Sequence, residues 1–264
     1  MASFLLRSVL ICFLASAFLP PDTVPASIID KTLTIQVFDV CNDSGGNCAS
    51  LGPIGDAFFV AEANKIWSQA GISIGFNLAG QINSTKFSNI NDSVSGYGLV
   101  DLMNASGHGY SGTIVDIFLV HTIVGAYGEG WFDWGGMGIA MDTVMAYNSG
   151  KGRIDTIAHE LGHNLGLVPT NLGGDAGGHS LSPNYLMASG AWRNVPTTLA
   201  NIAPDGLGLD LLPANQISLV RESPLLRDIT PVPEPSSVVL VAISIGTLGS
   251  IIWLVRRRVS WNDQ

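Results

Sequence analysis

The sequence is poor in charge, since only 12% of its 264 residues are Asp, Glu, Lys or Arg. This is about half the share of roughly 25% found in globular proteins, which argues against a disordered polar chain. Basic residues are scarcer still, with 12 Lys and Arg against 21 Asp and Glu, so the net charge of −9 argues against nucleic acid as a partner. The length allows one or two domains with a sizeable core.

Cysteine is also rare, with three in the chain. Cys12 lies in an apolar N-terminal stretch, which leaves Cys41 and Cys48 in the body of the protein. Two lone cysteines make a poor zinc site. In an oxidising compartment we expect Cys41 and Cys48 to form a disulfide.

The N-terminus has the pattern of an export signal. Arg7 is followed by an uninterrupted apolar run at residues 9–19. A run of this length is typical of the core of a signal peptide and is short for a membrane span. We therefore interpret residues 1–26 as a signal peptide and residues 27–230 as the exported domain.

The C-terminus, residues 231–264, has the pattern of a sorting signal. Pro233, Glu234 and Pro235 precede an uncharged apolar stretch at residues 238–255, and three arginines follow at 256–258. The stretch predicts a transmembrane helix with the arginines on the cytoplasmic side. These features resemble the PEP-CTERM sorting signal of Gram-negative bacteria, whose motif is recognised and processed by an exosortase. The resemblance implies a protein anchored in the inner membrane before sorting. It is then expected in the cell envelope, in the exopolysaccharide matrix or in the medium.

Hydrophobic patterning in the body predicts an α/β fold with a mostly parallel sheet and room for an antiparallel edge. Residues 80–112, rich in Gly, Ser and Asn, are expected to form a long surface excursion. A helix is expected at 56–70, and strands are expected at 33–40, 72–76, 113–120 and, once or twice, within 135–146.

The motif His159-Glu160-Leu161-Gly162-His163 is H-E-x-x-H, which chance would produce about 0.002 times in a chain of this composition. On a helix, Ile154, Ala158, Leu161 and Leu165 form one buried stripe, and the two histidines lie one turn apart on the other side. Two imidazoles at this spacing can bind one Zn²⁺. The Glu160 carboxylate lies beside them and is the candidate general base for a water activated by zinc.

Gly166 follows the second histidine by three residues, and Met187 follows it in the segment Asn184-Tyr185-Leu186-Met187-Ala188. Together with H-E-x-x-H these residues resemble the signature of metzincin zinc peptidases, in which such a methionine forms an apolar Met-turn under the metal. The resemblance implies a zincin fold with a twisted sheet, an active-site helix and a peptidase activity. It also implies that the strand at residues 136–140 lines the cleft and pairs with an extended substrate peptide.

One departure from that family concerns the third zinc ligand. The expected position holds Pro169, which cannot bind a metal. His179, on a glycine-rich segment between the helix and Met187, is the leading replacement. Asp175 is a second candidate, and a site with no third protein ligand is a further alternative.

Two other expectations concern the cleft. Ser189 occupies the position of the family's tyrosine, so Tyr185 is a candidate oxyanion donor in its place. The cluster Trp131-Phe132-Asp133-Trp134 belongs either to a lid beside the cleft or, as we expect, to the hydrophobic core.

The sequence as a whole favours an exported zinc-dependent endopeptidase that acts on protein or peptide substrates. A first alternative is a non-catalytic envelope or matrix protein that keeps the fold but has a degenerate metal site. A second is a zinc hydrolase of another bond, such as an amidase that acts on cell-wall or matrix material.

Overall fold

A computed structural model describes residues 28–229 except positions 50, 53–54, 56–57, 110–111, 133–134 and 173–178. The predicted signal peptide and the predicted sorting signal, with its membrane span at 238–255, lie outside these residues. Within the described part of the chain, no helix has the length and apolar character needed to cross a membrane.

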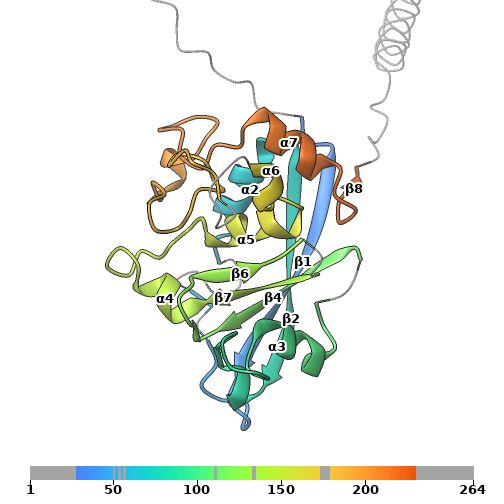
Figure 1. Cartoon of the computed structure of the whole chain (residues 1–264), viewed down its shortest axis with the longest axis vertical. Helices are drawn as coiled ribbons and strands as arrows, with labels where there is room; N and C mark the ends of the chain where they lie inside the picture. The colour runs from blue at the N-terminus through green and yellow to red at the C-terminus, as the bar shows by residue number, and fades with distance from the viewer. Residues whose placement is uncertain are drawn as a thin grey trace, which may run out of the picture. The chain divides into compact units, whose positions relative to one another are not determined.

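A mixed six-stranded sheet forms the centre of the domain (Figure 1). Its strands are β1 (Lys31–Cys41), β2 (Ile72–Asn83), β4 (Ile114–Val120), β6 (Gly128–Gly130), β7 (Gly136–Ala140) and β8 (Arg227–Asp228). They lie in the order β2-β1-β4-β7-β6, and β8 pairs with the start of β1. The first four strands of this order are parallel, whereas β6 is antiparallel to β7. The predicted α/β class, with a mostly parallel sheet and an antiparallel edge, is confirmed.

Side chains along a strand point alternately to opposite faces of the sheet. Both faces carry apolar side chains, and helices cover each of them. In β4, Ile117 lies in a core shared with α2 (Val60–Ser68) and α5 (Thr156–Asn164). The next residue, Phe118, lies in a second core with α3 (Leu99–Ser106). The other elements are η3 (Thr85–Phe87), β3 (Asn89–Ile90), β5 (Thr122–Ile123), α4 (Met141–Ala146), α6 (Pro169–Leu172), η4 (Leu199–Asn201) and α7 (Ala214–Arg221).

The prediction that residues 80–112 form one long surface excursion is wrong. β2 continues to Asn83, and α3 buries Leu99, Leu102 and Met103 at helical spacing against the sheet. The strand expected around Val144 is also wrong, since Met141 and Val144 lie one turn apart on the buried side of α4. Short amphipathic turns rich in polar residues and glycine give a weak periodic signal, so tertiary burial decides these segments.

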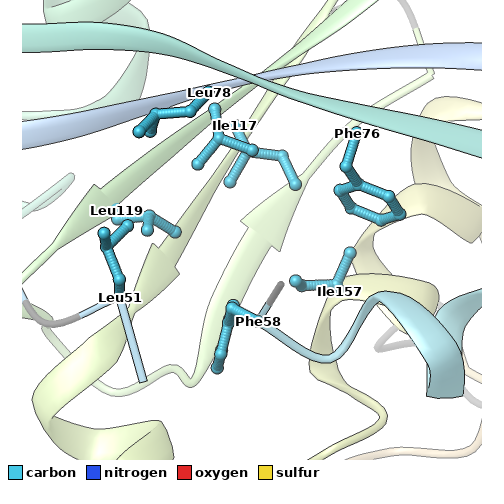
Figure 2. A pocket seen from close by; sticks show the side chains of 8 residues that line it. Leu51, Phe58, Phe76, Leu78, Ile117, Leu119 and Ile157 are labelled. Carbon is cyan, nitrogen blue, oxygen red and sulfur yellow. The ribbon is translucent and has the colours of Figure 1, made fainter. Parts of the chain in front are cut away.

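The packing between the sheet and the start of α5 leaves little free space. Eight apolar side chains surround a void of about 10 Å³, which is the room of roughly one water molecule (Figure 2). They are Val37, Leu51, Phe58, Phe76, Leu78, Ile117, Leu119 and Ile157. Phe58, Ile117 and Ile157 are buried, whereas Leu78 is 51% exposed, so the void lies at the border of the core.

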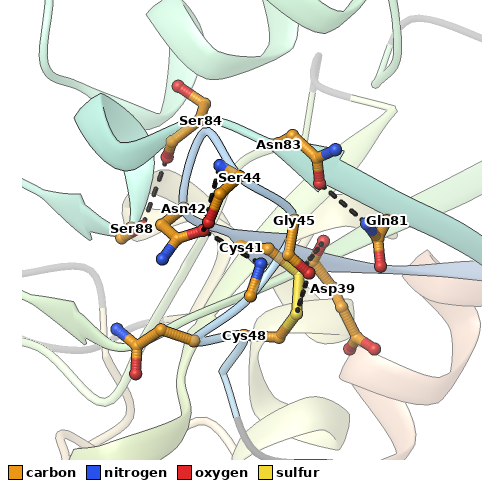
Figure 3. The surroundings of a disulfide bond; sticks show 12 residues. Asp39, Cys41, Asn42, Ser44, Gly45, Cys48, Gln81, Asn83, Ser84 and Ser88 are labelled. Atoms are coloured by element: carbon orange, nitrogen blue, oxygen red, sulfur yellow. Dashed lines mark hydrogen bonds between the residues drawn. A yellow bond between two sulfur atoms is a disulfide. The ribbon is translucent and has the colours of Figure 1, made fainter.

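A disulfide joins Cys41, the last residue of β1, to Cys48 (Figure 3). The loop between them is ordered by Asn42, whose side-chain oxygen accepts hydrogen bonds from the backbone N–H groups of Ser44 and Gly46 at 3.1 and 2.9 Å. The pairing expected from the sequence is present in the structure.

The burial of α3 can be tested with two matched leucine substitutions. Leu102 is fully buried and Leu207 is 72% exposed. We expect Leu102→Ala to lower the free energy of unfolding by about 2–5 kcal/mol, because it leaves a cavity in the core. Leu207→Ala should change it by less than about 0.5 kcal/mol. Denaturant titration measures both values, and equal effects would contradict the packing described for α3.

Candidate functional site

Helix α5 carries the H-E-x-x-H motif and lies against β6 and β7 (Figure 1). Ile154, Ala158, Leu161 and Leu165 are buried, as the predicted apolar stripe requires. The histidines and Glu160 are also buried, with exposed fractions of 6–7%, so they are not a solvated polar face. The helix ends at Asn164, and the chain turns away at Gly166, whose φ of 105° is in the region that favours glycine. The Leu167 N–H donates to the Gly162 carbonyl at 2.9 Å and closes the turn.

Three imidazoles converge beside this helix. Potential ligand atoms of His159, His163 and His179 all lie within 4.8 Å of one another. The ring centroids are 5.1 Å apart for His159 and His163, 5.3 Å for His159 and His179, and 5.6 Å for His163 and His179. Pro169 begins the short helix α6, and Asp175 lies outside the described residues.

Backbone carbonyls orient the two helical histidines. The Nδ1–H of His159 donates to the Leu186 carbonyl, and that of His163 donates to the Leu167 carbonyl, both at 2.7 Å. Each bond leaves Nε2 as the atom with the free lone pair, which is the arrangement typical of metal-binding histidines. Burial lowers the pKa of His163 to about 4 and that of His159 well below its usual value. Both rings are therefore neutral, the form that binds a metal.

The histidine cluster fits a zinc ion in ligand type and number. Bonds of about 2.0–2.1 Å at tetrahedral angles would bring the three nitrogens to about 3.4 Å from one another. The observed limit of 4.8 Å is close enough for small side-chain rotations to reach that spacing. Three protein ligands leave the fourth position open, as in catalytic zinc sites.

Glu160 lies next to the cluster, under the edge strand β6. Burial raises the pKa of this carboxyl to about 8, while Arg193 and Arg153 act in the opposite direction. The strand approaches very closely, since a Cβ built on Gly128 would lie 2.6 Å from Cγ of Glu160. One built on Gly130 would lie 2.8 Å from the Glu160 carbonyl oxygen. Only glycine allows this contact between strand and helix.

Met187 packs against α5 at Gly162. A Cβ built on Gly162 would collide with the sulfur of Met187, which is fully buried. The methionine expected to form a floor under the site therefore packs directly on the helix between the two histidines.

Four buried charged residues lie behind the site. Arg193 forms an ion pair with Asp155 at 2.9 Å, and its Nη1 contacts His159 Nδ1 and donates to the Leu186 carbonyl at 2.5 Å. Arg153 Nε lies 3.5 Å from Asp155. Burial and the neighbouring Asp155 hold the pKa of Asp210 well above its usual value, so this carboxyl favours its neutral form. This network links the start of α5 to the backbone of the Met187 segment.

The cluster opens into a cleft of about 800 Å³. The strand expected to line it, β7, is paired on both sides by β4 and β6, so that prediction is wrong. Among the described residues, β6 pairs only with β7, so its other edge is free on this side of the sheet. The cleft is lined by the segment from Gly125 to Trp131.

The aromatic predictions also need correction. Trp131 is 36% exposed and its ring centroid lies 6.3 Å from that of His163, while Phe132 is 51% exposed. The expected core position for these two residues is therefore wrong, and Trp131 borders the cleft. Among the described residues, the lining of the cleft includes Tyr127 and Tyr147 but not Tyr185.

Three residues of the cleft were missed in the sequence: Glu129, Arg153 and Arg193. Glu129 lies on β6, where burial and, secondarily, the carboxylates of Asp92 and Glu160 raise its pKa to about 8. Glu129 and Arg193 are far from the H-E-x-x-H motif in sequence, and tertiary contacts bring them to the cleft. Arg153 lies only six positions before His159, but no known spacing connects an arginine there with the motif.

Comparisons with known proteins give a fold likeness of limited extent. No family model and no curated protein matches the chain. An archaemetzincin from Methanopyrus kandleri is 10% identical with a TM-score of 0.42, covering 78% of this chain and 98% of its own. A zinc-dependent peptidase from Methanocorpusculum labreanum is 14% identical with a TM-score of 0.41, and the match covers 70% of this chain and 99% of the peptidase. At such values the likeness does not establish the activity of this chain.

The contact between Gly162 and Met187 generates a double-mutant test. Alanine would improve the helix propensity of position 162 by about 1 kcal/mol. The collision with the Met187 sulfur should instead make Gly162→Ala destabilising by about 1–3 kcal/mol. In the Met187→Ala background, we expect this cost to disappear. Thermal or denaturant unfolding of the four proteins gives the coupling energy, and additive effects would contradict the contact.

Proposed function

We propose that the chain is a zinc-dependent endopeptidase with His159, His163 and His179 as metal ligands and Glu160 as general base. The observation that carries this proposal is the convergence of His179, from a separate segment, with the two helical histidines. Two neutral imidazoles, a third histidine and one buried carboxyl, at the bottom of an open cleft, match the chemistry of a catalytic zinc centre.

Each residue has a defined part in the proposed reaction. A zinc ion in this site would supply a Lewis acid that polarises the peptide carbonyl and makes water more acidic. The positive charge of the ion would favour the ionised form of Glu160 over the neutral form that burial favours. As a carboxylate, Glu160 accepts a proton from the attacking water and delivers it to the leaving amine. The Leu186 and Leu167 carbonyls hold the ring orientation of His159 and His163. Met187 and Gly162 keep the helix in contact with the apolar floor.

The free edge of β6 is the proposed docking site of the substrate. An extended peptide can add to an exposed strand edge through main-chain hydrogen bonds. Gly128 and Gly130 bring this edge directly over Glu160. A peptide bound there would pass the three histidines, with Trp131 at the border of the cleft.

We further propose that the protein is exported, with residues 1–26 as signal peptide and residues 231–264 as a sorting signal processed by an exosortase. The sequence patterns at both ends support this, and so does the disulfide between Cys41 and Cys48. Disulfides persist in oxidising compartments outside the cytosol. The membrane partner before processing would be the predicted helix at 238–255.

The first test measures the metal. We expect one zinc ion per chain in protein purified without chelator, and an affinity at least about 100-fold lower in His179→Ala. Changes that only disturb ligand orientation typically cost about 10–100-fold, so loss of a ligand should exceed them. His108→Ala, outside the cluster, serves as control. Elemental analysis and competition with a chelator give both numbers. Unchanged affinity in His179→Ala would move the third ligand elsewhere, and absence of zinc binding would favour the non-catalytic alternative.

The second test measures the reaction. Glu160→Gln should retain zinc but lower kcat for peptide cleavage by about 10²–10⁴-fold, because the general base is lost. Digestion of a peptide mixture, read by mass spectrometry, gives the cleavage sites and rates. A zinc-loaded chain that cleaves no peptide would favour hydrolysis of another bond, such as an amide in cell-wall material.

A further inference from the structure

Arg153 is a buried cation that lines the cleft with part of its guanidinium unsatisfied. Its exposed fraction is 2%. Among the described residues, its Nε and Nη2 have no hydrogen-bond partner, and its ionic contact with Asp155 is long, at 3.5 Å. The guanidinium lies over the Tyr127 ring at 4.4 Å and the Tyr147 ring at 5.7 Å, and both rings also line the cleft.

Arg193, the other cleft arginine, is held much more completely. It pairs with Asp155 at 2.9 Å and donates to the Leu186 carbonyl at 2.5 Å and to the Ala188 carbonyl at 3.4 Å. These bonds tie it to the protein backbone below the metal cluster. Arg193 is therefore held by an ion pair and two backbone carbonyls, although its Nε also has no hydrogen-bond partner among the described residues. Arg153 has two such donors, Nε and Nη2, left over for a ligand.

The buried acidic residues beside these arginines do not face the cleft. Asp155 and Asp210 are completely buried and are not among the cleft-lining residues, whereas Arg153 and Arg193 are. The acidic groups that do line the cleft are Glu129 and Glu160, on the side of the edge strand and the metal cluster. The end of the cleft at Arg153 thus presents positive charge between two aromatic rings.

We propose that Arg153 determines specificity by binding a carboxylate of the substrate peptide, within about three residues of the cleaved bond. Planar guanidinium groups bind carboxylates through two parallel hydrogen bonds, and partial burial strengthens such pairs. The ligand is either an Asp or Glu side chain or the free C-terminal carboxylate of a short substrate. This inference rests on the proposed peptidase function.

The position of Arg153 relative to the three histidines determines how far the bound carboxylate lies from the cleaved bond. Arg153, Thr156, His159 and His163 line the cleft in succession along α5 and the turn before it. His159 follows Arg153 by six positions, which span the turn before α5 and the first residues of the helix, and this corresponds to a distance on the order of 10 Å along the chain. An extended peptide advances about 3.3 Å per residue, so three residues cover this length.

The test compares peptides that differ only in one charge, using the full chain loaded with zinc. Peptides that the chain cleaves are remade with Glu or Gln at each position within three residues of the bond, and with a C-terminal carboxylate or amide. We expect a preference of at least about tenfold in kcat/KM for the acidic form at one of these places. A preference between the Glu and Gln peptides would show that Arg153 binds a side-chain carboxylate, whereas a preference between the two C-terminal forms would show that it binds the C-terminal carboxylate.

Three arginine variants assign the preference. In Arg153→Gln the ratio should fall below about threefold, whereas Arg153→Lys, which keeps the charge but not the paired donors, should retain an intermediate ratio. Arg221→Gln removes an arginine whose ion pair with Asp30 lies on the surface, and it should leave the ratio unchanged. Circular dichroism and thermal unfolding check that each variant is folded, and Arg153→Lys still decides the matter if Arg153→Gln does not fold.

A binding measurement separates this inference from the peptidase proposal. Fluorescence anisotropy with the Glu160→Gln chain should give at least about tenfold tighter binding of the acidic peptide than of its amide, and the added Arg153→Gln change should remove the difference. If no peptide is cleaved, the peptidase proposal fails and this assay alone decides the role of Arg153. Equal binding of both peptides, or a preference that persists in Arg153→Gln, would overturn the inference.

Discussion

The candidate site depends on one backbone oxygen, the carbonyl of Leu186. It accepts hydrogen bonds from Nδ1 of His159 and Nη1 of Arg193. The first bond sets the direction of the His159 lone pair, and the second connects the same peptide group to buried Asp155. Met187, the next residue, presses on α5 at Gly162. A shift of this peptide group would therefore disturb ligand orientation, the ion pair and the floor of the site together.

The charges behind the site are a second constraint on the fold. Asp155, Arg153 and Arg193 are almost completely buried, and moving ions out of water costs several kcal/mol each. Mutual pairing offsets this cost only while every member stays in place, so such a network does little for stability by itself. Its value in this protein is positional: it joins the start of α5 to the Met187 segment and holds Arg153 at the cleft.

The sequence predicted the parts of the site whose residues are close in the chain. His159, Glu160 and His163 follow from helical periodicity, and His179 was the leading candidate because Pro169 cannot bind a metal. By contrast, α3 has only about two turns of periodic pattern in a polar stretch, and β6 is three residues long. The packing of Arg153 against the ring of Tyr127 is a contact that no local pattern encodes. Edge strands and buried arginines are products of tertiary packing.

The two glycines of β6 have a consequence for how this cleft can change through evolution or engineering. Because Gly128 and Gly130 have no side chains, the backbone of β6 contacts Glu160 directly. No side chain lies between them that could change this distance by changing its conformation. Glu129, between them, is the position on this strand at which substitution adds no atom to that contact. A larger residue at either glycine would collide with Glu160, so new substrate preferences would have to arise from residues at the ends of the cleft.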